Sequence, residues 1–333
     1  MSRKARESGT LPRPLAVLAA LALAGATGLA IRMLPAGAGP APPSAAAPAH
    51  FAPPRPPVAA QEPRRSFVGF VDTAREPGFD LAAESRGTGV LRYALGHLVA
   101  GGDGCLVRWA GPPRPGGDPV AAGLGRLRAA GGDAFPVFGG PDGHDPAVTC
   151  TRPGGLATAY RRAVGAFGAA AAGFEIRDAA DTDAVLRRAR ALRAVQGERP
   201  LRVCFTLRLK PDGLGAADLA MLRATRREGA RVDTIELLAE MEPRDGPEGR
   251  LRRLGSAVRA AAGQLARAYA LPDEEQVWER LALTPVLAGS GDLDEPEARK
   301  LSDYAVRHGL AWLSLRGTSP KADVSRILWR THS

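Results

Sequence analysis

The feature that most constrains the fold is a regular alternation of short β-rich segments with longer helical segments between residues 66 and 333. Eight β-rich segments can be distinguished, at residues 67–73, 90–99, 134–139, 173–177, 202–209, 234–240, 281–287 and 310–315. The helical segments between them include residues 118–130, 155–171, 181–196, 214–228, 250–269 and 295–308. A repeated strand-then-helix order is typical of a parallel sheet with right-handed crossovers. Eight such units favour a closed (β/α)8 or TIM barrel, with functional residues at the carboxyl ends of the strands.

The first 34 residues have the pattern of an export signal. A cluster of arginine and lysine residues precedes an apolar stretch at residues 15–31, and small residues that suit cleavage follow at Ala36-Gly37-Ala38. An apolar stretch of this length fits both a cleaved signal peptide and a retained membrane anchor. In either case the basic flank predicts that the rest of the chain crosses the membrane. We therefore expect an extracytoplasmic protein, either secreted or anchored to the membrane by the N-terminal helix.

Residues 35–65 are rich in proline and alanine. Such a density of proline opposes regular structure and favours an extended, disordered tether. The sequence thus predicts a signal or anchor at residues 1–34, a linker at residues 35–65 and one folded domain at residues 66–333.

The net charge of +10 does not indicate nucleic-acid binding. In the folded region no basic run is interleaved with aromatic residues, which is the pattern that such binding requires. No Gly-x-Gly-x-x-Gly motif follows the first strand, and this argues against a dinucleotide-binding fold. No cysteine or histidine spacing suggests a zinc site. We therefore predict no nucleic-acid partner, no cofactor and no metal.

The chain contains three cysteines. In an oxidising compartment an odd number leaves one pair and one free thiol. Cys204 lies in the apolar run Val203-Cys204-Phe205, so we expect it to be buried and unreactive. Cys105 and Cys150 both lie in loop-like sequence and are the predicted disulfide.

Several short motifs follow one another along the folded region. They are FVGFVDT at 67–73, YALGHLV at 93–99, Phe138-Gly139-Gly140, Phe205-Thr206-Leu207, Leu283-Thr284-Pro285 and WLSL at 312–315. In order and spacing these motifs resemble the secreted actinobacterial branch of glycoside hydrolase family 18, the chitinases. The resemblance extends from about residue 67 to residue 317, and it implies a chitinase-like barrel outside the cytoplasm. Cys105 and Cys150 also match the positions of paired cysteines in that branch.

The fourth strand departs from the family pattern. In the family this strand reads Asp-x-x-Asp-x-Asp-x-Glu, where the final glutamate is the general acid and the N-acetyl group of the substrate is the nucleophile. Here the four positions hold Ala170, Gly173, Glu175 and Arg177. Arginine stays protonated and cannot pass a proton to a glycosidic oxygen. Strand alternation places Gly173, Glu175 and Arg177 on the interior face, with Glu175 one pleat deeper than the acid position.

Other positions that line the substrate in the family have also changed. The Met-Asp-Tyr run of the sixth strand corresponds to Glu240, Met241 and Glu242, and the closing tryptophan corresponds to Arg316. In the fifth strand the family's proline and methionine positions hold Arg208 and Lys210. Joint loss of the acid, the acetamide contacts and the stacking platform predicts a catalytically impaired or inactive domain.

We therefore expect a chitinase-like domain that binds a glycan or a cell-wall component. The residues predicted to contact a ligand are Asp72, Trp109, Glu175, Arg177, Arg208, Lys210, Glu240, Glu242 and Arg316. The charges either form a polar pocket for an anionic sugar, phosphate or carboxylate, or they pair with one another and fill the site. His97 is expected to be a buried, hydrogen-bonded barrel residue. The alternatives are an active glycosidase on N-acetylglucosamine polymers with Glu175 as a relocated acid, and a purely structural or interaction module.

Overall fold

In the computed structural model, the described residues are 66–113, 117–242, 249–271 and 274–330. The predicted signal or anchor and the predicted linker lie outside these ranges. None of the helices in the described ranges has the length and apolar character needed to span a membrane.

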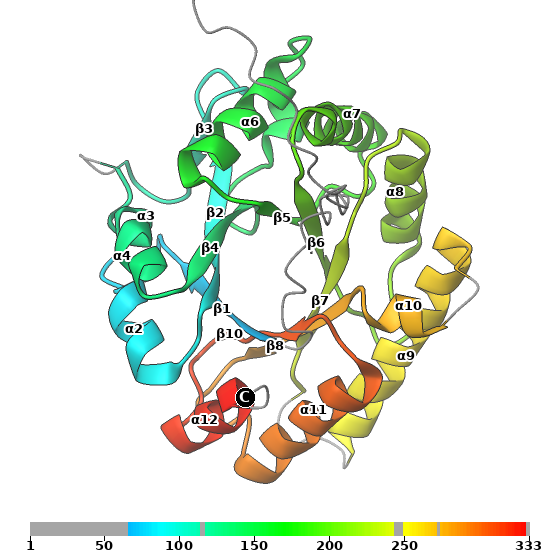
Figure 1. The fold of residues 1–333 in the computed structure, drawn as a ribbon. Helices are drawn as coiled ribbons and strands as arrows, with labels where there is room; N and C mark the ends of the chain where they lie inside the picture. The colour runs from blue at the N-terminus through cyan, green and yellow to red at the C-terminus, as the bar shows by residue number, and fades with distance from the viewer. Residues whose placement is uncertain (1–65, 114–116, 243–248, 272–273, 331–333) are drawn as a thin grey trace, which may run out of the picture. The chain divides into compact units, whose positions relative to one another are not determined.

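A closed barrel of parallel strands forms the centre of the domain (Figure 1). Its strands are β1 (Ser66–Asp72), β2 (Arg92–Ala100), β4 (Asp133–Gly139), β5 (Ala171–Glu175), β6 (Arg202–Arg208), β7 (Thr234–Glu240), β8 (Leu281–Leu287) and β9 (Trp312–Leu313). The barrel closes because β1 pairs in parallel with both β2 and β9. Two short strands are added to it: β3 (Val107–Trp109) runs antiparallel to β2, and β10 (Arg316–Gly317) pairs with β8. The predicted (β/α)8 barrel is confirmed.

Helices surround the barrel (Figure 1). They are α2 (Leu81–Thr88), α3 (Pro119–Ala122), α4 (Leu124–Ala129), α5 (Pro146–Thr149), α6 (Gly155–Phe167), α7 (Thr182–Glu198), α8 (Ala216–Arg227), α9 (Arg250–Tyr269), α10 (Glu274–Trp278), α11 (Glu295–His308) and α12 (Ala322–Arg330). Several begin at an aspartate whose carboxylate accepts backbone N–H groups of the first turn, as Asp80, Asp181 and Asp294 do. The helix predicted at residues 118–130 is divided in two, because Gly123 ends α3 and precedes α4.

The fourth strand of the barrel, β5, alternates as the sequence predicts up to its end. Phe174 faces the helices, where its ring stacks on Phe138 at 5.0 Å and meets Tyr160 edge-on at 5.1 Å. Gly173 and Glu175 therefore face the interior. The strand ends at Glu175, two residues earlier than predicted, so Arg177 lies beyond it rather than within it.

The predicted disulfide is present. Cys105, between β2 and β3, is bonded to Cys150 at the end of α5, at a sequence separation of 45. Cys204 in β6 is a buried free cysteine, as predicted.

Candidate functional site

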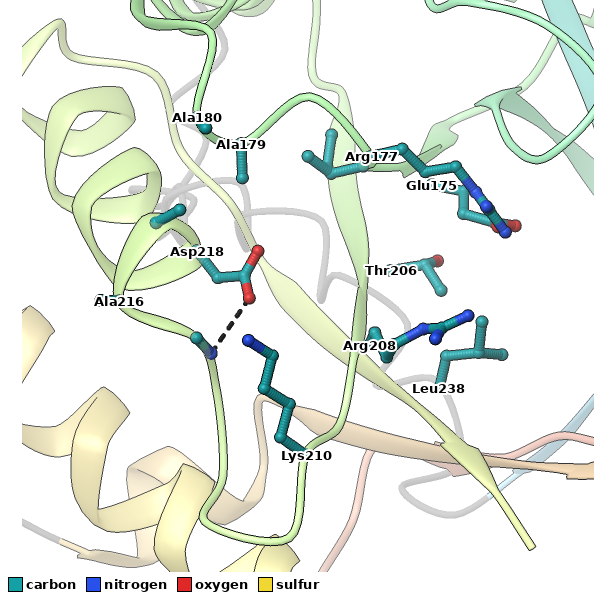
Figure 2. A pocket seen from close by; sticks show the side chains of 13 residues that line it. Glu175, Arg177, Ala179, Ala180, Thr206, Arg208, Lys210, Ala216, Asp218 and Leu238 are labelled. Atoms are coloured by element: carbon teal, nitrogen blue, oxygen red, sulfur yellow. Dashed lines mark hydrogen bonds and ion pairs between the residues drawn. The ribbon is translucent and has the colours of Figure 1, made fainter.

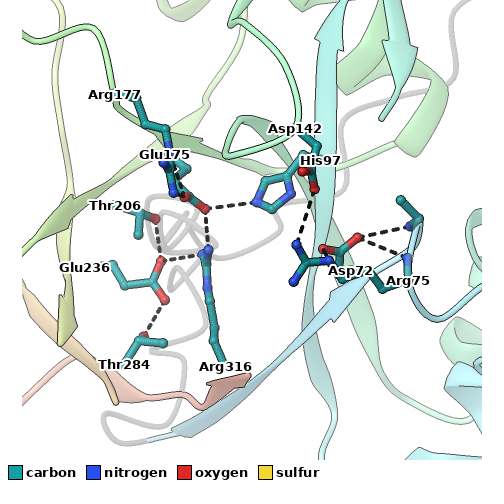
Figure 3. A network of polar contacts seen from close by, with 11 residues as sticks. Asp72, Arg75, His97, Asp142, Glu175, Arg177, Thr206, Glu236, Thr284 and Arg316 are labelled. Carbon is teal, nitrogen blue, oxygen red and sulfur yellow. Dashed lines mark hydrogen bonds and ion pairs between the residues drawn. The ribbon is translucent and has the colours of Figure 1, made fainter. Parts of the chain in front are cut away.

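Glu175, the last residue of β5, is only 5% exposed. Its Oε2 atom accepts a hydrogen bond from Nε2 of His97 at 2.9 Å and another from Nη1 of Arg316. Its Oε1 atom lies 3.4 Å from Nε and from Nη2 of Arg177. Figure 3 shows the three basic side chains directed at this one carboxylate from separate parts of the barrel. The one carboxylate among the four motif positions is thus held by three partners.

These partners determine the ionisation state of Glu175. Burial alone would raise the pKa of its carboxyl, but the hydrogen bond from His97 and the positive charge of Arg316 outweigh burial and hold that pKa well below its usual value. Because the carboxylate is ionised, Nε2 of His97 carries the hydrogen of their shared bond. An ionised carboxylate has no proton to donate to a glycosidic oxygen.

Arg316 connects Glu175 with a second buried acid. Its side chain is 8% exposed, and its Nη2 atom lies 3.6 Å from Oε2 of Glu236. Its guanidinium carbon lies 3.8 Å from the centre of the Phe70 ring, which adds a cation–π attraction. The resemblance implies a tryptophan under the sugar at this position. In this protein a cation that bonds across the barrel takes that place.

Glu236, in β7, completes the network, although no sequence motif indicated it. It is 6% exposed and accepts hydrogen bonds at 2.5 Å from the hydroxyls of Thr206 and Thr284. The available signal was the alternation along β7, which places Glu236, Leu238 and Glu240 on one face of the strand. The buried charges of this network are therefore paired across at least four strands, as buried charges must be. Within Arg316, Nη1 is hydrogen-bonded, whereas Nε and Nη2 are buried without a hydrogen-bond partner.

A cavity of about 590 Å³ lies beside this network and is lined by its members His97, Glu175, Arg177 and Arg316. Within the described residues, β1 pairs with β9 through Ser66 and Phe67 only. Beyond β9 the chain pairs with β8 instead, as strand β10. Lining residues of the cavity include Phe67, Phe70, Asp72, Phe79, Tyr93, His97, Glu175, Arg177, Arg316 and Trp329. Small-molecule sites have volumes of roughly 300–1,000 Å³ and mix apolar walls with a few polar groups. In size and lining the cavity fits such a site.

Asp72, at the end of β1, lines the cavity and also caps its own turn. Its Oδ1 atom accepts the backbone N–H groups of Ala74 and Arg75 at 3.1 and 3.3 Å. Its Oδ2 atom lies 3.5 Å from Nε of Arg75. These bonds hold the carboxylate in position at the cavity wall, and its role in ligand binding stays a prediction.

The four predicted cations do not gather at one point. Arg316 and Arg177 contact Glu175, whereas Arg208 and Lys210 lie with Arg177 around a second pocket of about 370 Å³ (Figure 2). Strand register explains this division, because Arg208 is the last residue of β6 and Lys210 lies beyond it, on the side of α8.

Three other predicted ligand contacts have local partners. Glu240, at the end of β7, forms an ion pair with Arg208 at 2.9 Å. Glu242 accepts hydrogen bonds from Arg253 and is not among the residues that line these two cavities. Trp109 likewise is absent from both linings, and its ring packs 5.8 Å from that of Phe167. His97 is buried and hydrogen-bonded, as expected, but its partner Glu175 was not predicted.

The closed barrel and its surrounding helices define a (β/α)8 domain. Its fold is that of glycoside hydrolase family 18 chitinase domains. The structure is similar to the catalytic domain of the hyperthermophilic chitinase from Pyrococcus furiosus, with a TM-score of 0.69, 23% identity, and coverage of 81% of this chain and 95% of that chain.

It is also similar to a GH18 chitinase from Pseudoalteromonas aurantia, with a TM-score of 0.55, 9% identity, and coverage of 80% of this chain and 99% of that chain. For putative chitinase A from Streptomyces coelicolor the TM-score is 0.55, with 12% identity and coverage of 81% and 99%. No protein-family model and no curated protein matches the sequence. At these identities the likeness establishes the fold, and the chitinase-like barrel implied by the motifs is confirmed.

Proposed function

We propose that this protein is a chitinase-like domain that binds a glycan without hydrolysing it. The observation that carries the proposal is the buried ion pair between Glu175 and Arg316, reinforced by His97. A general acid must hold a proton and must lie within hydrogen-bond reach of the leaving oxygen. Glu175 lacks the proton because its pKa is lowered, and it lies below the level of the family's acid.

The position of the family's acid also has no group that can cycle a proton. Arg177 occupies it, and the side chain of Arg177 is 52% exposed and contacts Glu175. A guanidinium is protonated throughout the accessible pH range. Glu175, at the preceding interior position, corresponds to the family's last aspartate, which contacts the acetamido group, but here it is bonded to Arg316 and His97. The alternative of an active glycosidase with Glu175 as a relocated acid is therefore not favoured.

Glycan binding is supported by the cavity and by structural relatives. The cavity around Glu175 is about 590 Å³ and is lined in part by the aromatic rings of Phe70 and Trp329. Aromatic faces provide apolar contact area at small-molecule sites. Mutants of the Pyrococcus furiosus chitinase, which this chain resembles at a TM-score of 0.69 and 22% identity, form complexes with chito-oligosaccharides.

The cellular setting is part of the same proposal. We infer that the domain acts outside the cytoplasm, secreted or held by its N-terminal segment, and that its ligand is a cell-wall or environmental glycan, anionic in character. The disulfide between Cys105 and Cys150 supports this setting, because such bonds persist in oxidising compartments. The proline-rich linker suits a tether that holds the domain away from a membrane or cell wall.

A paired measurement tests the proposal. The full-length protein is mixed with chitotetraose, and binding is measured by calorimetry while product formation is followed by chromatography. We expect binding without cleavage, both in the wild type and in Glu175→Gln. Cleavage by the wild type that disappears in Glu175→Gln would establish the relocated acid instead. A failure to bind chitotetraose and every member of a glycan array would favour a purely structural or interaction module.

A further inference from the structure

The second pocket lies beside the network of Glu175 rather than within it. Its volume is about 370 Å³, and it opens between the carboxyl ends of β5 and β6 and the start of α8 (Figure 2). Its lining residues are Glu175, Ile176, Arg177, Ala179, Ala180, Thr206, Arg208, Lys210, Gly215, Ala216, Ala217, Asp218 and Leu238. We call it the cationic pocket, because three of its side chains are Arg177, Arg208 and Lys210.

These cations come from chain segments that the barrel holds at fixed positions. Arg177 follows β5 by two residues, Arg208 ends β6, and Lys210 pairs through its backbone with Gly213, in hydrogen bonds of 2.8 and 2.9 Å. The ammonium of Lys210 lies over Gly215, where an added Cβ would be 3.1 Å from Nζ. Two arginines and a lysine around one concave pocket are the groups that recognise carboxylate, sulfate or phosphate.

Helix α8 adds to the positive potential. It has 12 residues, and Ala216 and Ala217 of its first turn line the pocket. The first N–H groups of an α-helix have no acceptor within the helix, and the helix dipole places partial positive charge there. The three side chains and the helix end therefore act in the same direction, and Asp218 in the first turn of α8 offsets part of this potential.

Two carboxylates, Glu175 and Asp218, also line the pocket, so three cationic side chains face two anionic ones and the lining keeps a net charge of +1. Glu175 is 4% exposed in its side chain and is bonded to His97 and Arg316 as well as to Arg177. Asp218 accepts a hydrogen bond from the backbone N–H of Gly215 at 3.1 Å, and its charge attracts that of Lys210. Arg208 pairs with Glu240, but both side chains are more than 60% exposed, at 61% and 66%. An exposed pair contributes little energy, so a ligand can compete for Arg208.

We propose that the cationic pocket binds the acidic group of an oligosaccharide, a sugar carboxylate in particular, while neighbouring sugar units extend toward the larger cavity. The inference rests on the proposed glycan-binding function and defines the class of glycan. Arg177 and Glu175 line both cavities, so one extended ligand can contact both. The cationic pocket then selects for charge, and the larger cavity accepts the sugar ring.

Calorimetry on the full-length protein with three probes tests the proposal. The probes are a hyaluronan tetrasaccharide, which alternates glucuronate with N-acetylglucosamine, the neutral chitotetraose, and free sulfate. We expect the acidic tetrasaccharide to bind at least about tenfold more tightly than chitotetraose, with sulfate much weaker than either. The preference should fall between 50 and 200 mM salt, because salt screens exposed charges.

Variants connect the preference to the pocket. Lys210→Met keeps the length of the aliphatic stem and removes the charge. It should weaken binding of the acidic probe by roughly tenfold, as expected for one charge-assisted hydrogen bond, and should weaken chitotetraose binding far less. Lys300→Met is the matched control, because Lys300 is exposed on α11 and is not a lining residue. Lys210 is exposed as well, so the substitution should not prevent folding.

Each outcome decides between the two proposals. Equal affinity for the acidic and neutral probes, or full acidic binding by Lys210→Met, would overturn the cationic pocket but leave glycan binding in place. Sulfate binding as tight as that of the acidic probe would overturn the assignment to a sugar. Cleavage of chitotetraose would overturn the proposal that the domain binds a glycan without hydrolysing it. The cationic pocket would still be supported if the preference for the acidic probe were lost in Lys210→Met.

Discussion

Nη1 of Arg316 donates a hydrogen bond to Oε2 of Glu175, and this bond joins residues that are 141 positions apart in the sequence. The sequence resemblance places Glu175 one pleat below the family's acid and Arg316 where the family has its stacking tryptophan. In that correspondence, a single ion pair occupies two positions of the hydrolytic site. Because the two departures from the family pattern bond to each other, they form one structural unit rather than two separate losses.

Replacing Arg316 by leucine should destabilise the domain strongly. The change leaves Glu175 and Glu236 buried without their shared cation, and loss of one partner of a buried pair costs about 3–5 kcal/mol. Urea unfolding followed by circular dichroism measures the loss. Arg208→Leu is the control, because its pair with Glu240 is exposed and its loss should change stability little. Equal effects of the two substitutions would contradict the buried ion pair.

The stability of the wild type should fall in acid partly through Glu175. Its pKa is lower in the folded protein than the value of about 4.3 in an unfolded chain, so it stabilises the fold above pH ~4.3. That contribution is lost progressively as the pH falls below this value. We expect the free energy of unfolding to drop less between pH 6 and pH 3 in Glu175→Gln than in the wild type. Parallel pH profiles would show that the pKa of Glu175 is not lowered.

Restoring the acid alone should not restore hydrolysis. Arg177→Glu returns a carboxyl group to the family's position, but Glu175, at the position of the family's last aspartate, would still be paired with Arg316. We expect no product from chitotetraose, measured by chromatography, in this variant. Turnover by Arg177→Glu would mean that the acid is the single missing element of the hydrolytic machinery.

A second buried ionic group lies outside the barrel, on α7, and should contribute to stability. Arg188 is 1% exposed, and it bonds to Asp145 at 3.0 Å and to Asp178 at 2.5 Å. Arg188→Met leaves two carboxylates without their cation and should cost about 3–5 kcal/mol in urea unfolding. On the same helix, Arg190→Met is the matched control, because the Arg190 side chain is 65% exposed and its partner Glu228 is half-buried, and it should have little effect.

The disulfide should contribute substantially to stability. It closes a loop of 45 residues, and loop-closure entropy for that length corresponds to about 4 kcal/mol. Cys105→Ser combined with Cys150→Ser should lower the free energy of unfolding by this order. The remaining thiol, Cys204, is buried, which raises its pKa well above the usual value. It should react with a thiol reagent only after unfolding, and rapid labelling of the native protein would contradict its burial.

The fold followed closely from local patterns. The predicted strands 234–240 and 281–287 and the predicted helices 250–269 and 295–308 agree with β7, β8, α9 and α11 at both ends. In these segments hydrophobic periodicity, capping residues and breakers point to the same boundaries. The predicted boundaries of a strand were wrong where pairing with strands distant in the sequence sets them. The eighth strand, predicted at 310–315, pairs as β9 over two residues and resumes as β10 along β8.

The candidate site was only partly predictable. Alternation along the fourth strand placed Glu175 inside the barrel, and the resemblance of the motifs predicted that Arg177 stands where the family has its acid. Neither pattern could identify the partners of Glu175. The sequence predicted only that His97 is a buried, hydrogen-bonded barrel residue, and Glu236 matched no motif.

By itself the sequence determined the order of strands and helices, the disulfide, the burial of Cys204 and the face on which Glu175 lies. These properties depend on local periodicity and on residue chemistry. The tertiary structure alone decided that His97 and Arg316 hold Glu175, and that Arg208 and Lys210 belong to a separate pocket beside α8. The reason is geometric. Strand alternation sets the direction of a side chain, but barrel closure sets which side chains from other strands it meets.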